Sequence, residues 1–503
     1  MRKWILTVLV ALIIVNAFAE KYTPDYDSLA SAPIPQWWDD GKFGIFIHWG
    51  PYSVAGYKHK FRGYAEAITS DLYNNPDNYK EWMIEKFGAA PPDFGYKDMA
   101  PMFTAEKWDP AEWAALFKAT GARYVIPTGE HHDGYALWDS ELTPWTATKI
   151  GPKRDLIGDL AKAVRAEGLK FGISYHRERH PGRFAKNNQL VWGEAHDQIK
   201  EEIRRMPEAA LLYGPFEYSD EFIADYVARW KEVERKYQPD FMWLDDVPIL
   251  RFGKGDPQII KYEDAFKQMI ADYFNTAQEW GKEVWVNNKG KTANWPVGVG
   301  CLEADNLHME RAGPRWQNPA TMSTSYAYME NEEINDLYKT PAELVRLLCD
   351  VVSKNGNLLL NIGPRADGVI PDGMKRRLLA MGQWMQVNGE AIYGSRPWST
   401  YGEYRGEIIE EDNVHYTRHS QRIHQIEYRF TASKDGKTVY AIVFRPLHSN
   451  VMIEALKDSD IRAVSMLGSK ARIKWERAPA GFTAALPVAD LQDMPAVLKI
   501  TLK

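Results

Sequence analysis

The chain has 503 residues, a formal net charge of −6 and 45% hydrophobic residues. This length allows a large catalytic domain and one accessory domain, and the apolar content is that of an ordinary folded protein. The small negative charge excludes the basic footprint of a nucleic-acid-binding protein. Nineteen Trp and 26 Tyr favour a test for a carbohydrate partner, because aromatic faces stack on sugar rings.

The first 19 residues have the pattern of a signal peptide. Arg2 and Lys3 precede an apolar run over residues 5–15, and Ala17-Phe18-Ala19 offers a small-x-small cleavage site. The run is too short to cross a bilayer comfortably and no later stretch is long enough, so we expect no membrane span. The pattern predicts export, to the periplasm or out of the cell, after cleavage near Ala19.

Residues 20–395 repeat one pattern: an apolar run with a polar or aromatic end, a loop, and an amphipathic helix. Six apolar runs predict buried strands, at 43–50, 123–128, 170–174, 241–244, 284–286 and 357–362. Two weaker strands are expected around Leu302 and after Thr324. Caps and helical spacing mark five helices, at 109–121, 157–167, 219–237, 263–280 and 341–354. This alternation predicts an α/β fold, a (β/α)8 TIM-like barrel.

The pattern changes near Tyr393. Residues 425–430 and 438–444 alternate around an Asp435-Gly436 turn, which indicates a hairpin. Short strands follow at 471–475 and 497–502, and no helix-length apolar period appears after residue 395. Residues 396–503 are therefore expected to form a C-terminal β-sandwich that buttresses the barrel.

The two cysteines carry little information. Cys301 and Cys349 have neither C-x-x-C nor zinc-site spacing. One disulfide and two buried thiols fit equally well. No cofactor is implied.

Polar side chains follow the predicted strands, and a barrel brings such strand ends to one pocket. Asp245 ends the run 241–244, where barrel enzymes keep catalytic groups, although an Asp after a strand often only begins a turn. Histidines at three strand ends, with tryptophans beside them, suit a site that hydrogen-bonds the hydroxyls of a sugar. The expected pocket residues are His48, Trp49, His131, His132, Tyr175, His176, Trp243, Asp245 and Asn287.

Hydrolysis of a glycosidic bond needs two carboxyl groups, one at the anomeric carbon and one to protonate the leaving oxygen. Asp245 suits the first role, and Glu303 and Glu310 are the candidates for the second. A metal site is the rival explanation for histidines beside an aspartate. Because His131 and His132 are adjacent rather than four residues apart, they do not easily face one metal from a regular helix, and no metal is predicted.

The motifs that carry a family resemblance are Phe46-Ile-His48-Trp49-Gly50-Pro-Tyr-Ser53, Glu81-Trp82, His131-His132-Asp133-Gly134, Trp243-Leu-Asp245 and the stretches 352–364 and 388–397. In these motifs the chain resembles the α-L-fucosidases of glycoside hydrolase family 29, across nearly its whole mature length. The resemblance implies a barrel followed by a β-sandwich. It also implies a retaining, exo-acting hydrolase of terminal α-L-fucosyl residues on oligosaccharides or polysaccharides.

The resemblance also implies roles for individual residues. Asp245 matches the nucleophile and Glu303 the acid/base, with Glu310 still open. The matched sugar-binding positions are His48, Glu81, Trp82, His131, His132, Tyr175, Trp243 and Tyr326. Two departures matter: Lys289 ends Asn-Asn-Lys where the family has Asn-Asp-Arg, so a transition-state Arg is not carried over, and Cys301 replaces an expected Asp.

The loop at 176–186 is strongly basic in an acidic protein. It is either a solvated loop or a site where Arg177 and Arg179 meet a sulfate or uronate on an anionic fucosylated glycan. Two further alternatives stay open. One is a glycosidase for galactose or another sugar with the same axial hydroxyl, and the other is a non-catalytic sugar-binding protein on the same fold.

Overall fold

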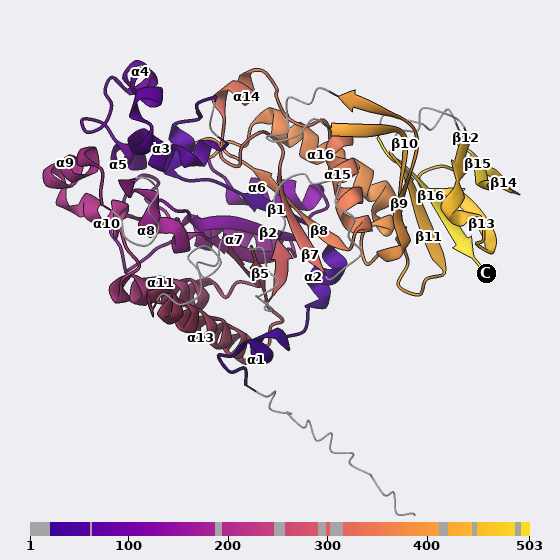
Figure 1. The fold of residues 1–503 in the computed structure, drawn as a ribbon, viewed down its shortest axis with the longest axis horizontal. Helices are drawn as coiled ribbons and strands as arrows, with labels where there is room; N and C mark the ends of the chain where they lie inside the picture. Colours follow the sequence, from indigo (N-terminus) through magenta and orange to yellow (C-terminus); the bar gives the residue numbers. More distant parts are fainter. Residues whose placement is uncertain are drawn as a thin grey trace, which may run out of the picture.

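The structure is a computed structural model that describes residues 21–60, 63–186, 194–245, 257–289, 298–301, 315–411, 421–444, 450–487 and 494–503. A barrel with its helices lies beside a set of antiparallel sheets that carries the C-terminus (Figure 1). The signal peptide expected at 1–19 lies outside the described residues, and export stays a prediction. No described helix combines the length and the apolar character needed to cross a membrane.

Eight parallel strands close into a barrel, because β1 pairs with both β2 and β8. The strands are β1 (Phe43–Ile47), β2 (Tyr124–Glu130), β3 (Lys170–Tyr175), β4 (Phe241–Leu244), β5 (Trp285–Asn288), β6 (Val299–Cys301), β7 (Trp316–Thr321) and β8 (Gly356–Ile362). The barrel and its six strong strands are confirmed, and β6 lies beside Leu302 as expected. The strand predicted after Thr324 is wrong. The remaining barrel strand is β7, which ends at Thr321, before that residue. The sequence of β7 contains Asn and Pro, which have a low propensity for strands. Pairing with β6 and β8 therefore determines that this segment is a strand.

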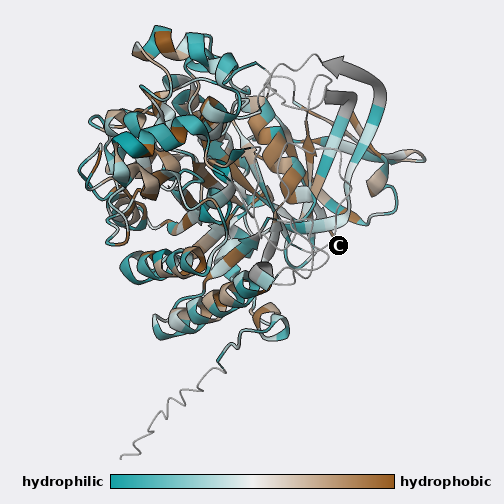
Figure 2. Ribbon diagram, turned by 60° about the vertical axis from the view of Figure 1, so that its left-hand side comes forward, coloured by the Kyte–Doolittle hydropathy of each residue, from teal (hydrophilic) through white to brown (hydrophobic). Residues whose placement is uncertain are grey.

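Helices that return the chain between strands form the outer layer of the barrel. They are α6 (Pro110–Ala119), α7 (Leu156–Ala166), α11 (Asp220–Tyr237), α13 (Pro257–Glu279), α15 (Pro341–Ser353) and α16 (Asp372–Asn388). The caps that predicted two of them are present: Asp109 accepts hydrogen bonds at the start of α6, and Thr340 forms a capping box with Glu343 at the start of α15. Helices of this layer show hydrophilic and hydrophobic colours in turn along their length, as expected for helices with one buried face (Figure 2).

Shorter helices lie in the connections. They are α1 (Tyr26–Ala30), α2 (Gln36–Gly41), α3 (Ile68–Asn74), α4 (Pro76–Phe87), α5 (Tyr96–Met99), α8 (His180–Arg183), α9 (Asp197–Arg205), α10 (Ala210–Tyr213) and α14 (Glu330–Ile334). Those that follow β1 and β3 gather on the side of the barrel away from the C-terminal sheets (Figure 1). This side is therefore the carboxyl end of the strands.

Two antiparallel sheets follow α16, which confirms the β-sandwich. One has the strand order β13-β16-β11-β10-β9 and the other β12-β15-β14. The strands are β9 (Arg396–Glu411), β10 (Gln421–Ala432), β11 (Thr438–Val443), β12 (Asn450–Ile453), β13 (Ile461–Met466), β14 (Lys474–Ala478), β15 (Gly481–Ala485) and β16 (Ala496–Leu502). The predicted hairpin joins β10 to β11, and Gly436 in its turn has φ +70°. The domain limits 20–395 and 396–503 stay predictions.

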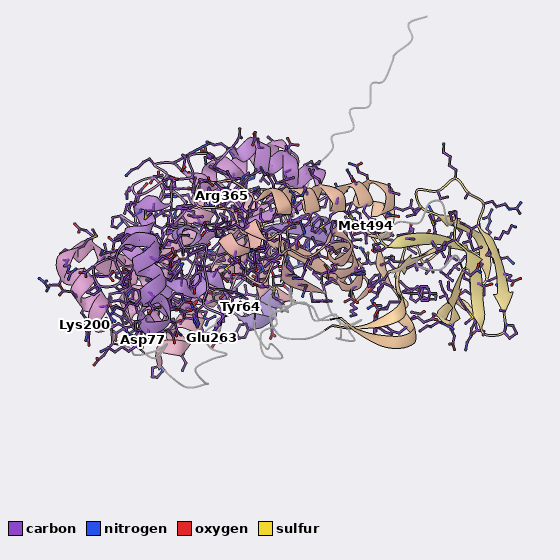
Figure 3. All side chains as sticks on the ribbon, turned by 90° about the horizontal axis from the view of Figure 1, so that it is seen from above. Tyr64, Asp77, Lys200, Glu263, Arg365 and Met494 are labelled. Atoms are coloured by element: carbon purple, nitrogen blue, oxygen red, sulfur yellow. The ribbon has the colours of Figure 1, made fainter. Side chains whose placement is uncertain are left out.

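A buried group of charges joins the sheets to the barrel. Arg429 on β10 donates from Nε to Oδ1 of Asp350 on α15 at 2.5 Å, and Lys354 Nζ lies 2.8 Å from the other oxygen. All three side chains are buried. Side chains fill this junction, where the labelled Met494 packs against the core of the barrel (Figure 3). The two parts are therefore docked by both polar and apolar contacts.

The interior of the barrel is packed mainly with aromatic side chains. The cluster contains Trp38, Phe46, Tyr124, Ile126, Phe241, Trp243, Trp285, Cys301, Tyr326 and Leu359. Cys301 and Cys349 are both buried free thiols, so the disulfide alternative does not hold. Because side chains fill the interior of the barrel, we expect the functional site at the carboxyl ends of the strands.

Candidate active site

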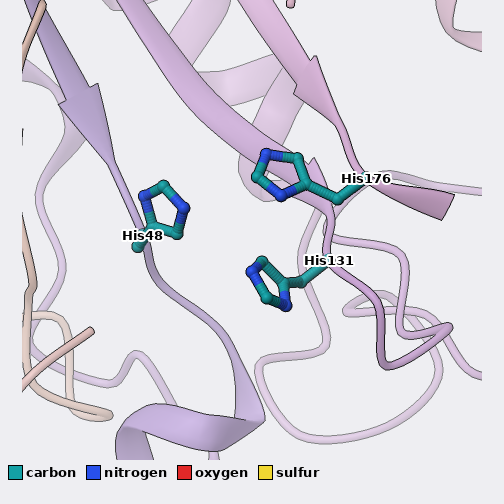
Figure 4. A group of neighbouring side chains, drawn as sticks. All are labelled: His48, His131 and His176. Atoms are coloured by element: carbon teal, nitrogen blue, oxygen red, sulfur yellow. The ribbon is translucent and has the colours of Figure 1, made fainter. Parts of the chain in front are cut away.

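Three histidines from separate strand ends face one another at the carboxyl end of the barrel (Figure 4). His48 follows β1, His131 follows β2 and His176 follows β3. The centre of the His131 ring lies 5.7 Å from that of His48 and 4.8 Å from that of His176. All three are buried. The structure thus brings the predicted histidines into one cluster.

Asp245 lies at the end of β4 beside this cluster. His132 Nε2 is 3.0 Å from its Oδ2, and Lys289 Nζ contacts its Oδ1. Arg179 Nη1 is 3.7 Å from Oδ2. Burial alone would raise the pKa of Asp245, but Lys289, then His176 and His132, outweigh burial and hold this pKa well below its usual range. The carboxyl group is therefore an anion at neutral pH.

The histidines of the cluster are neutral. Burial lowers the pKa of His48 to about 4, and it lowers the pKa values of His131 and His176 well below the ordinary value. His48 Nδ1 donates to Oδ1 of Asn361 at 2.7 Å, which leaves Nε2 as an acceptor. Nδ1 of His131 and Nδ1 of His176 are buried without a hydrogen-bond partner in the described part of the chain. These nitrogens suit the hydroxyls of a ligand.

Two aromatic rings border the histidines. The ring centre of Trp243 is 5.4 Å from that of His176 with an interplanar angle of 29°, and Trp243 Nε1 donates to Gln317 Oε1 at 2.9 Å. The ring of Tyr326 is 4.8 Å from that of His48. Both rings therefore lie beside the histidine cluster, where the sequence predicted them.

Tyr175 does not face this site, which corrects the prediction. Its hydroxyl donates to the backbone oxygen of Tyr226 at 3.0 Å, and its ring packs against Tyr226 and Trp230 on α11. Successive side chains of a strand point to opposite faces. Ser174 and His176, which contact each other, therefore face inward while Tyr175 faces the helices. Of these two residues, which were both predicted for the pocket, His176 faces it and Tyr175 does not.

Glu81 and Trp82 also lie away from the cluster. Glu81 is exposed on α4, a helix at the periphery of the molecule, and the ring of Trp82 stacks on that of Tyr57 with centres 4.4 Å apart (Figure 1). The matched Glu-Trp pair is too short a motif to specify a position, and here it belongs to the surface of α4.

A buried carboxylate that the strand-end pattern missed lies closer. Glu66, in the 3-10 turn Ala65–Ala67, accepts hydrogen bonds from Ser325 Oγ at 3.1 Å and from Ala327 N at 3.0 Å. These two residues flank Tyr326. Burial raises the pKa of Glu66. Because Glu66 belongs to a loop and not to the end of an apolar run, no periodic signal marked it.

Two other residues expected in the pocket have structural roles. Trp49 faces the layer outside the barrel, and its Nε1 donates to the backbone oxygen of Arg365 at 2.8 Å. Asn287 on β5 is buried, accepts from Leu244 N at 2.5 Å and donates to Leu244 O at 2.9 Å. It therefore holds the strand end that precedes Asp245.

The basic loop after Tyr175 is buried, so its interpretation as a solvated loop is wrong. Arg177 donates to Oε1 of Glu130 at 2.6 Å and also contacts Asp225. Arg229 Nη1 lies 3.2 Å from Oε2 of Glu130. Arg177 is 3% exposed and already paired, whereas Arg179 is 27% exposed and lies near Asp245. Of the two arginines proposed to meet an anionic group, only Arg179 is placed to do so.

The acid/base cannot be located in the structure. Glu303, Glu310 and Asp246 lie outside the described residues. The choice of Glu303 over Glu310 stays a prediction.

The cluster also contains atoms of the kind that bind metals. Two triads, His48, His131 and His176, and His132, His176 and Asp245, each hold ligand atoms within 4.8 Å of one another. However, Lys289 and Arg179 already supply positive charge beside Asp245. A resident cation fits this arrangement poorly, and the absence of a metal stays a prediction.

The site combines a buried anionic carboxylate with neutral histidines and aromatic rings at the strand ends of a barrel. This combination is typical of enzymes that act on sugars. A family model described as Alpha-L-fucosidase matches residues 10–390, and one described as Alpha-L-fucosidase C-terminal domain matches residues 412–503. An alpha-L-fucosidase of Branchiostoma floridae is 31% identical over 490 residues, which cover 95% of this chain and 94% of that protein. Tissue alpha-L-fucosidase of Homo sapiens is 29% identical, with 96% and 91% covered.

Solved structures agree. The crystal structure of Thermotoga maritima alpha-fucosidase in complex with a mechanism based inhibitor has a TM-score of 0.74 and 32% identity. The similarity covers 96% of this chain and all of that one. The chain belongs to the α-L-fucosidase family and is a glycoside hydrolase.

Proposed function

We propose that the protein releases terminal α-L-fucosyl residues from glycans by a retaining double displacement. The observation that carries the proposal is Asp245, a buried anion at a rigid strand end. Such a carboxylate suits attack on an anomeric carbon to form a glycosyl-enzyme. His132 and Lys289, which contact its two oxygens, are positioned to hold it. The similarity to an alpha-fucosidase bound to a mechanism based inhibitor supports the same chemistry.

The neutral histidines are assigned to the sugar. His131 and His176 each have a buried nitrogen without a described partner, and His48 offers an acceptor. Three such groups around one space match several hydroxyls of one fucose. Trp243 and Tyr326 then pack against its apolar parts. Groups that converge in this way on one sugar fit the end of a chain, which supports exo action.

The acid/base is proposed from the sequence alone. Glu303 protonates the leaving oxygen in the first step and deprotonates the attacking water in the second, and Glu310 is the alternative. A non-catalytic sugar-binding protein would use the same pocket without this second carboxyl group.

The stereochemistry of the first product tests the mechanism. Hydrolysis of an aryl α-L-fucoside, followed by proton NMR from the first turnovers, is expected to give α-L-fucose before mutarotation. Initial formation of the β anomer would contradict retention. Binding of fucose without any turnover would instead favour the sugar-binding protein.

Lys289 is expected to control the acid limb of activity. Its loss in Lys289→Met removes the nearest positive charge and raises the pKa of Asp245, so the carboxylate becomes protonated at a higher pH. We expect the loss in kcat/KM to be about tenfold larger at pH 4.5 than at pH 7. Lys289→Arg keeps a cation and is the matched control. Equal losses in Lys289→Met at the two pH values would show that Lys289 does not set this ionisation.

We also propose that the substrate carries an anionic group and that Arg179 binds it. This guanidinium is partly exposed and 3.7 Å from Asp245, so it is placed to meet a sulfate on the bound sugar or its neighbour. Arg179→Ala is expected to reduce kcat/KM for a sulfated fucoside about tenfold more than for its unsulfated counterpart. The exposed Arg205→Ala on α9 serves as control. The same loss on both substrates would remove the proposal.

A further inference from the structure

A cavity of about 390 Å³ lies between the part of the chain that follows β1 and the part that follows β7. Residues of two segments line it, among them Tyr57, Lys58, Thr324, Met329, Glu332 and Leu337. The same two stretches of chain supply Tyr64 and Tyr326, whose ring centres are 5.6 Å apart, and Tyr326 reaches the ring of His48. One of the segments that line the cavity therefore also supplies Tyr326, which contacts the histidine cluster. Its volume lies within the range of about 300–1,000 Å³ for pockets that bind small molecules.

Glu332 on α14 gives this cavity a polar group in need of a partner. The side chain is 3% exposed, and its Oε1 accepts from Thr324 N at 3.0 Å and from Thr324 Oγ1 at 2.5 Å. Its Oε2 is buried and has no hydrogen-bond partner among the residues that the structure describes. A buried carboxylate oxygen without a donor is costly. A ligand hydroxyl in the cavity is a suitable donor.

The walls are held in place before any ligand binds. Lys58 Nζ donates to Gly63 O at 3.1 Å and to Thr324 O at 3.2 Å, which ties the two segments together. Trp82 stacks on one face of Tyr57 with an interplanar angle of 13° and fixes the orientation of that ring. Tyr57 therefore presents a rigid aromatic surface beside the buried oxygen of Glu332.

We propose that this cavity binds the neutral sugar unit that carries the fucose. Glu332 Oε2 accepts a hydrogen bond from one of its hydroxyls, and the ring of Tyr57 packs against its apolar face. The inference rests on the proposed function, because a glycan whose fucose fills the histidine cluster must place its next sugar at the rim. Contacts with this second sugar would determine which glycan the enzyme prefers.

The test compares two substrates that differ only in the leaving group, an aryl α-L-fucoside and a fucosylated lactose. Glu332→Gln and Tyr57→Leu are expected to lower the ratio of kcat/KM on the oligosaccharide to kcat/KM on the aryl fucoside about tenfold. Glu330→Gln is the matched control, because it makes the same change on the same helix at an exposed residue paired with Lys86. Its ratio is expected to equal that of the wild type.

A binding measurement separates this inference from the proposed function. Lactose alone is expected to give saturation-transfer NMR signals with the wild type that weaken at least severalfold in Glu332→Gln. Equal signals in the two proteins, or an unchanged ratio in both cavity variants, would overturn the inference while hydrolysis of the aryl fucoside continued. Absence of aryl fucoside turnover by the wild type would overturn the proposed function, and lactose binding would still report on the cavity.

Discussion

Asp245→Gly is expected to lower kcat for an aryl α-L-fucoside by about 10⁴-fold or more, the scale seen when an enzyme loses its nucleophile. The variant removes the carboxylate that we propose as the nucleophile. It leaves the histidines and Trp243, so fucose binding is expected to persist. Steady-state rates and fucose titration measure the two effects separately.

Azide distinguishes a lost nucleophile from a damaged fold. In the space left by Asp245→Gly, azide is expected to attack the same carbon and to yield β-L-fucosyl azide, with partial recovery of the rate. A folded Asp245→Gly variant that stays inactive with azide and gives no azide product would argue against Asp245 as the nucleophile. An unchanged rate without azide would exclude that role altogether.

Glu130→Gln is expected to destabilise the protein by about 3–5 kcal/mol, which is the cost of removing one partner from a buried ion pair. The side chain is 0% exposed and pairs with Arg177 and Arg229, and both guanidinium groups stay buried when its charge is lost. Activity is expected to fall as well, because Glu130 precedes His131 and Arg177 follows His176. Denaturant unfolding and kcat/KM measure the two effects.

Glu201→Gln is a matched control. Glu201 on α9 also pairs with two arginines, Arg204 and Arg205, but this group lies at the surface, where ion pairs contribute little. No measurable change in unfolding is expected for it. A Glu130→Gln variant as stable as this control would mean that the buried group does not hold the loop that carries His176.

The parts of the fold that were predictable are those with a strong local signal. Residues 241–244 are all apolar and residues 357–362 are mainly apolar, and Asp109 and Thr340 mark helix starts through their caps. The strand β7 has no such signal, since its pairing with β6 and β8 decides its conformation. Local sequence therefore predicts strands whose own residues favour the strand conformation. It misses strands such as β7, whose conformation depends on the strands that pair with it.

The site shows the same division at the level of single residues. His48, His131 and Asp245 follow strands directly, so the barrel topology alone brings them together. The choice between Tyr175 and His176 depends on a shift of one residue, which reverses the face of a strand. Glu66 lies in a 3-10 turn and Glu332 on the short helix α14, and only the folded chain shows that both are buried.

The charged junction between barrel and sheets has a practical consequence for protein engineering. A truncation at Arg396 would remove Arg429, which donates to Asp350, and would expose the face of α15 that now meets the sheets. The apolar side chains that now meet the sheets would face water, which favours aggregation. Attempts to shorten this enzyme should therefore keep β9 and β10, because these strands contact α15 on the barrel.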